Sequence, residues 1–241
     1  MPSLPADVRH QPFDDCPVVT DEVYAYMNTF ALGLADIASY AAIPSLIFLV
    51  AQYRWRHRAY YPLLMMILAD LLLTGSLSAW LSHRRINNLF LTHYWTITEL
   101  PLWGFFFLTL FRDHSRRQRL VITGMITGVA FAIINMIFIQ PPAAFNSNAR
   151  TVAALIEIFF CLLYFLKYPD TEDTGGFWIV AALLVYNASN MLLFMLSNYL
   201  LQLPDKRNFM IAWSVNNILL IVLCLTIIPD YYIRKPTNHG G

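Results

Sequence analysis

Charged residues are scarce in this sequence. Asp, Glu, Lys and Arg make up 13% of its 241 residues, whereas 58% are hydrophobic, and soluble domains contain roughly a quarter charged residues. The mean hydropathy is +0.51. Together these values exclude an ordinary soluble domain and predict an integral membrane protein. The net charge is only +1, and the basic residues stand in short runs between apolar segments, so nothing favours nucleic-acid binding.

Several chemical motifs are also missing. The three cysteines lack the spacing of a disulfide framework or a zinc site. The lysines, Lys167, Lys206 and Lys235, all lie at the ends of apolar runs or between them, which excludes a retinal Schiff base. His-x-x-x-His, His-Glu-x-x-His, Gly-x-Ser-x-Gly and phosphate-binding glycine loops are absent. We therefore expect no catalytic residues, no metal and no cofactor, and an enzyme is the less favoured class.

Long apolar runs are abundant instead, and each is long enough for a transmembrane helix. There are seven, at residues 35–53 (starting as early as Tyr24), 62–81, 88–111, 120–139, 149–166, 177–201 and 209–228. The predicted fold is all-α, a polytopic bundle of seven transmembrane helices over residues 26–230. We expect residues 1–25 to be a short polar extracytoplasmic segment and residues 231–241 a short cytoplasmic tail, in a bacterial inner (plasma) membrane.

The basic residues of the short loops predict the orientation, because Lys and Arg are enriched on the cytoplasmic side. With the N-terminus outside, ten basic residues fall inside and six outside. The inner set is Arg54, Arg56, Arg58, Arg112, Arg116, Arg117, Arg119, Lys167, Arg234 and Lys235, and the outer set is Arg9, Arg84, Arg85, Arg150, Lys206 and Arg207. We therefore expect the N-terminus out and the C-terminus in.

The third run contains a carboxylate near the middle of the bilayer. An ionised Glu99 without a partner there would cost at least about 2.5 kcal/mol. Thr92, Thr96, Glu99 and Trp103 share one helical stripe, with Trp95 on its flank. Glu99 must therefore have a partner on another helix.

Glu157 in the fifth run also lies near mid-membrane, on a stripe that begins with Arg150. Two such carboxylates need a shared proton, a cation or hydrogen-bond donors. They form either a proton-binding or ligand-binding pair, or two neutral acids that join helices by hydrogen bonds. Arg150 lies two turns outward of Glu157, about 10 Å by helix rise, and could reach inward. We expect Glu99→Gln to leave stability nearly unchanged or to improve it, because the substitution removes a desolvated charge.

Polar side chains of the last two runs complete the candidate site. Amides inside a membrane either bind ligands or join helices, at about 0.6 kcal/mol each in the second case. Under the expected orientation these side chains lie in the middle or outer half of the membrane. The predicted ligand-binding residues are Glu99, Glu157, Tyr186, Asn187, Asn190, Asn217, His93 and Trp95.

Two further titratable residues have open roles. His93 is either a sensor of external pH that caps the pocket or an amphipathic residue at the headgroup level. Asp70 in the second run either extends a proton path inward or pairs with Arg54 or Arg112 of the basic inner loops.

Gly124 and Gly128 form a Gly-x-x-x-Gly pattern in the fourth run. Such a pattern allows two helix backbones to approach closely. The close contact lies either within the bundle or in a homodimer.

Several of these motifs together resemble an uncharacterised family of small bacterial seven-helix inner-membrane proteins. The motifs are His93-Tyr94 with Glu99, Phe145-Asn146-Ser147 with Arg150 and Glu157, Phe177-Trp178 followed by Tyr186, Ser189 and Asn190, and Trp213 with Asn217. The resemblance covers most of the chain from the second run onward. It implies the fold and the importance of these positions, but no activity. The layout is also loosely similar to the seven-helix sensor modules of bacterial histidine kinases.

Three functional hypotheses follow. The favoured one is a receptor-like or sensory protein that binds a small polar or cationic ligand in an outward-facing intramembrane pocket and signals through a separate protein, because the tail is too short to act alone. The alternative is a proton-coupled transporter or channel that uses Glu99 and Glu157. A weaker alternative is an intramembrane lipid-modifying enzyme with His93 and a carboxylate as acid and base.

Overall fold

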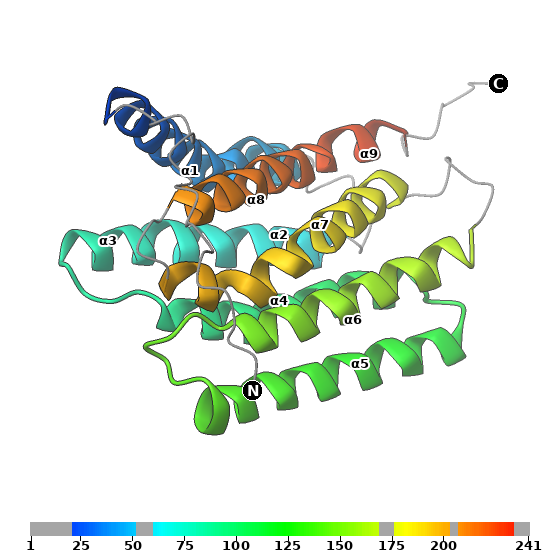
Figure 1. The fold of residues 1–241 in the computed structure, drawn as a ribbon. Helices are drawn as coiled ribbons and strands as arrows, with labels where there is room; N and C mark the ends of the chain where they lie inside the picture. The colour runs from blue at the N-terminus through cyan, green and yellow to red at the C-terminus, as the bar shows by residue number, and fades with distance from the viewer. Residues whose placement is uncertain (1–20, 52–59, 169–175, 203–206, 234–241) are drawn as a thin grey trace, which may run out of the picture.

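The computed structural model describes residues 21–51, 60–168, 176–202 and 207–233, and all regular secondary structure in these ranges is helical. Figure 1 shows the helices running alongside one another in one bundle. Most of the predicted polar N-terminal segment and of the predicted tail lies outside the described residues. For the described residues, the helices confirm the predicted all-α fold.

The helices coincide with the seven apolar runs to within a few residues at most ends, although the first helix begins earlier, at Asp21. Two contain π-helical segments, η2 and η3. In chain order the elements are α1 (Asp21–Ala51), α2 (Tyr60–Asp70), η2 (Leu71–Leu77), α3 (Ser78–His83), α4 (Phe90–Leu110), α5 (Ser115–Ile134), η3 (Asn135–Ile139), α6 (Ser147–Phe165), α7 (Phe177–Gln202), α8 (Arg207–Leu225) and α9 (Ile227–Ile233).

Five helical segments within the described residues are long and apolar enough to cross a membrane. They are Tyr60–His83, Ser115–Ile139, Ser147–Phe165, Phe177–Gln202 and Asn208–Asp230. The distribution of side chains agrees, because Ile126, Phe138 and Leu166 on the surface are 65%, 79% and 74% exposed while Glu99 and Glu157 are buried. Apolar groups outside and polar groups inside are what lipid surroundings require. The chain is an integral membrane protein.

Helix α4 is not one of the five segments. It packs against α2, α5 and α6, and Figure 1 places it between α2 and α5. Its second half forms an aromatic core. The Trp103 and Phe106 rings are 5.7 Å apart, and Phe107 lies 5.5 Å from both Phe106 and Phe160 of α6. This core packs the second half of α4 against α6, on the C-terminal side of Glu99.

The two ends of the bundle differ, and we name them by residues. At the Asn146 end, α3 and η3 finish and α4 and α6 begin. At the Asp230 end, α4 finishes, α2 and α7 begin and α9 follows α8. The predicted orientation would put the Asn146 end outside and the Asp230 end inside.

The glycine pair of α5 packs inside the bundle. A Cβ atom at Gly128 would lie 2.3 Å from Leu100 Cδ2 and 2.7 Å from Ile156 Cδ1, and one at Gly124 would lie 2.8 Å from Phe160 Cε1. These neighbours belong to α4 and α6 of the same chain. The pattern is thus explained by close packing within the bundle, and it supplies no evidence for a homodimer through Gly124 and Gly128.

We expect Gly128→Leu to destabilise the protein by about 1–3 kcal/mol, because an added side chain must displace Leu100 and Ile156. Ala130→Leu is the matched control, since Ala130 is exposed on the same helix. The measurement is the melting temperature in detergent. Equal melting temperatures for the two variants would contradict the packing of α5 against α4 and α6.

Candidate functional site

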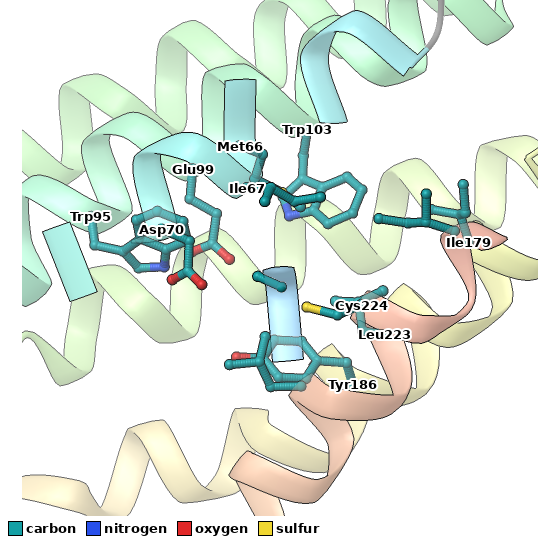
Figure 2. Close-up of a pocket in the computed structure, with 13 residues that line it drawn as sticks. Met66, Ile67, Asp70, Trp95, Glu99, Trp103, Ile179, Tyr186, Leu223 and Cys224 are labelled. Carbon is teal, nitrogen blue, oxygen red and sulfur yellow. The ribbon is translucent and has the colours of Figure 1, made fainter. Parts of the chain in front are cut away.

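A pocket lies between α1, α2, α4, α7 and the α8–α9 segment. Its empty space, counted together with the space open to the surroundings, is about 470 Å³. Two carboxylates, Asp70 and Glu99, and three aromatic side chains, Trp95, Trp103 and Tyr186, contribute to its wall, and aliphatic side chains and Cys224 line the rest. Figure 2 shows Asp70, Glu99 and Trp95 on one side of this space and Tyr186 and Cys224 on another. Such a mostly apolar cavity with a few polar groups is typical of small-molecule sites.

The pocket extends from mid-height toward the Asp230 end. Ile179, near the start of α7, and Ile227, the first residue of α9, both line it. Only Trp95 lies clearly nearer the Asn146 end. Under the orientation predicted from the basic residues, the pocket therefore belongs to the inner half of the membrane, whereas the sequence suggested an outward-facing pocket.

Asp70 stands where α2 passes into the π-helix η2. Its Oδ1 atom lies 2.5 Å from the Thr74 hydroxyl, and its backbone carbonyl oxygen lies 2.9 Å from the same group. No Lys or Arg among the described residues forms an ion pair with Asp70. Of its two predicted partners, Arg54 lies outside the described residues and Arg112 is exposed after α4. The structure instead places Asp70 on the same pocket as Glu99.

Glu99 is paired with a cation deep in the bundle. Arg150 Nη1, from the first turn of α6, donates to Glu99 Oε2, and both side chains are buried. The Arg150 guanidinium also lies 4.5 Å from the centre of the Phe194 ring of α7. A charge-assisted hydrogen bond and a ring face offset the cost of burying these charges. Arg150 thus reaches inward, as its place on the Glu157 stripe suggested.

Glu157 has a different partner. Asn187 Nδ2 of α7 donates to Glu157 Oε2 at 2.8 Å, and Glu157 Oε1 has no partner among the described residues. Glu157 does not line the pocket, and the described contacts include no hydrogen bond between it and Glu99. Both carboxylates interact electrostatically with Arg150. Of these two acids, the guanidinium is hydrogen-bonded in the described contacts to Glu99 alone, and it acts on Glu157 only through its charge.

The other predicted residues separate into groups. Tyr186 and Trp95 line the pocket, and the Tyr186 hydroxyl donates to Asn216 Oδ1 at 3.3 Å. Asn216 in turn donates to Asn217 Oδ1 at 3.4 Å, so Asn217 is connected to the pocket only indirectly. Asn190 is buried with its Nδ2 atom unpartnered among the described residues.

His93 lies elsewhere and is 1% exposed. Its Nε2 atom is 3.2 Å from the carbonyl oxygen of Ala144, in the connection between η3 and α6. The imidazole is therefore packed inside the bundle and is not presented on its surface. It holds this connection against α4, at the Asn146 end.

A network of side-chain amides and hydroxyls closes the Asn146 end. Asn146 and Ser147 were named from the sequence only in the family resemblance, and this network was not predicted. Asn146 Nδ2 donates to Thr96 Oγ1 at 3.1 Å, and Asn135 Nδ2 donates to Asn146 Oδ1 at 3.0 Å. Gln140 and Asn198 donate to Ser147 Oγ at 2.7 and 2.9 Å. These bonds join η3, α4, α6 and α7. A further signal in the sequence is the concentration of Asn, Gln and Ser between residues 135 and 148.

The Asp230 end has its own buried polar contact. Asp230 accepts hydrogen bonds from the Gly176 backbone N–H at 2.9 and 3.1 Å and from the Tyr60 hydroxyl at 3.0 Å. It thereby joins the starts of α2 and α7 to α9, beside the pocket residue Ile227. Its position close to the end of the last apolar run gave no hint of these partners.

The charges of this region favour cations. Asp70 and Glu157 each interact electrostatically with Glu99 and with Arg150. Three carboxylates with one guanidinium have a formal charge of −2 when all are ionised. Protons or a bound cation would neutralise this excess. Within the described residues, no group of three or more His, Cys, Asp and Glu side chains is arranged to hold a metal ion.

No protein-family model, no curated protein and no solved structure matches this chain at a significant level. The resemblance to a family of small bacterial seven-helix proteins therefore stays a prediction. Arguments about function must come from the site itself.

The ion pair makes a prediction that differs from the one made from sequence. Glu99→Gln should destabilise the protein by about 3–5 kcal/mol, because it leaves the buried Arg150 without its carboxylate. Arg150→Met should cost a similar amount, and the double variant less than the sum of the two. Unfolding free energies in mixed detergent micelles test this, with the exposed Arg119→Met as control. Strictly additive losses would mean that the two side chains do not interact.

Proposed function

We propose that this chain is a receptor-like protein with seven transmembrane helices, the N-terminus outside and the C-terminus inside, that binds a small ligand in the pocket between α2, α4 and α7. Occupancy would be passed to a separate protein. The observation that carries the proposal is that Asp70 and Glu99 face one cavity inside an apolar bundle. Ionisable residues are costly within a membrane, and they generally mark functional sites.

The residues between the pocket and the Asn146 end favour binding over transport. A cation leaving the pocket toward the Asn146 end would have to pass the Arg150 guanidinium, and a fixed positive charge in a narrow path repels cations. It would also have to separate the hydrogen bonds of Asn146 with Thr96 and Asn135. These features support a pocket with access from one side only.

A proton-coupled transporter or channel is the second candidate. In its favour, Asp70, Glu99 and Glu157 form one electrostatically connected set at mid-height, in reach of protons from the pocket. The intramembrane enzyme finds no such support, because His93 does not line the pocket that contains the carboxylates.

The proposed orientation predicts the location of two sites along the chain. A reporter fused after Gly241 should behave as cytoplasmic, and one inserted beside Asn146 should behave as external. The basic residues support this expectation, since ten fall inside and six outside. The measurement is the activity of compartment-specific reporters in a bacterial host. The opposite pattern would place the pocket in the outer half of the membrane.

Ligand binding is tested by melting the purified protein with a library of metabolites. A ligand at 100 times its dissociation constant should add about 2.7 kcal/mol of stability. Ala42→Leu, which puts a larger side chain into the pocket, should abolish this stabilisation, whereas Ala130→Leu on the outer surface should retain it.

In liposomes the wild-type protein should transport neither the ligand nor protons. Measurable flux would establish the transporter instead.

A further inference from the structure

The pocket contains one carboxylate that has no cation. Glu99 is already bound by Arg150, whereas Asp70 has only the Thr74 hydroxyl as a partner in the described residues. Both carboxylates line the same cavity, and Figure 2 shows both directed toward it. The local charge therefore favours a cation at Asp70.

The rest of the pocket wall determines which kind of cation can bind. A small metal ion needs about six oxygen ligands, and the wall offers mainly aliphatic carbon and the side chains of Trp95, Trp103 and Tyr186. Aromatic faces attract organic ammonium ions, most strongly where water is excluded. A carboxylate beside indole and phenol rings thus suits an alkylated ammonium group better than a metal ion.

A second polar group in the pocket has no partner. Trp103 is 1% exposed, and its indole N–H finds no acceptor among the described residues. In Figure 2 the indole nitrogen lies on the side of the ring that faces Glu99. A buried donor normally has an acceptor. A ligand with an oxygen next to its ammonium group would supply one.

We propose that the pocket binds a small organic ammonium ion that also carries a hydrogen-bond acceptor, as an amino alcohol does, with the ammonium at Asp70 and the acceptor at the Trp103 indole. This inference rests on the proposed binding function and names its ligand class.

Choline, tetramethylammonium and 3,3-dimethylbutan-1-ol are the probes, the last being the uncharged carbon analogue of choline. Titration calorimetry of the wild-type protein in detergent should detect choline and tetramethylammonium, and no binding of the alcohol. Asp70→Asn should weaken choline binding about ten- to a hundredfold, because the quaternary ammonium would lose the carboxylate charge that faces it. Asp113→Asn, which neutralises an exposed acid after α4, should leave it unchanged.

Trp103→Phe keeps a ring but removes the N–H donor. Its affinity loss should be several-fold larger for choline than for tetramethylammonium, and the exposed Trp80→Phe should change neither. Equal losses for the two probes would overturn the assignment of the acceptor. Because the comparison of choline with its neutral analogue uses the wild-type protein, it holds even if a variant fails to fold.

The outcomes also separate this inference from the proposed function. Equal binding of choline and 3,3-dimethylbutan-1-ol, or a metabolite screen that yields only uncharged or anionic ligands sensitive to Ala42→Leu, would overturn the ammonium site and leave the receptor-like function standing. Binding of sodium ions in place of the ammonium probes would also overturn it. A pocket that binds none of these compounds would refute both.

Discussion

The buried ion pair between Arg150 and Glu99 organises the centre of this bundle. A guanidinium inside an apolar bundle must be paired, and Arg150 finds Glu99 on α4 and the ring of Phe194 on α7. Because Arg150 itself belongs to α6, one side chain ties three helices together at mid-height. Removing either charge leaves the other uncompensated, so the relative positions of α4 and α6 depend on this contact.

The need to satisfy buried polar groups also decides where a ligand can bind. Glu157 is held by Asn187, and the amides at the Asn146 end satisfy one another. Polar groups that are hydrogen-bonded in this way join the helices and are not free to bind a ligand. Asp70 and the Trp103 indole differ from Glu157 because they line the cavity. Among the described residues, Asp70 accepts only from the Thr74 hydroxyl, and the indole N–H has no acceptor. A polar ligand can therefore bind in the half of the bundle toward Asp230.

The sequence predicted the helices well because apolar length alone determines them. It also identified Glu99, Glu157, Tyr186 and Trp95, since polar residues in long apolar runs are conspicuous. The sequence could not show which of these residues line the pocket and which join helices. Helical periodicity defines a face of one helix but not the rotation of that helix against its neighbours. Long-range partners such as Gly176 for Asp230 leave no local pattern at all.

The π-helix η2 limits what helical periodicity can predict, and it contacts a carboxylate of the pocket. A π-turn holds an extra residue, so the faces of the second helix change at η2, directly after Asp70. Thr74 has one hydroxyl proton and two acceptors there, the Asp70 carboxylate and the Asp70 backbone carbonyl. A cation that engages the carboxylate would weaken its hold on this proton and favour the bond to the backbone. Under the proposed function, η2 is thus the element that contacts the pocket carboxylate directly, through the Thr74 hydroxyl.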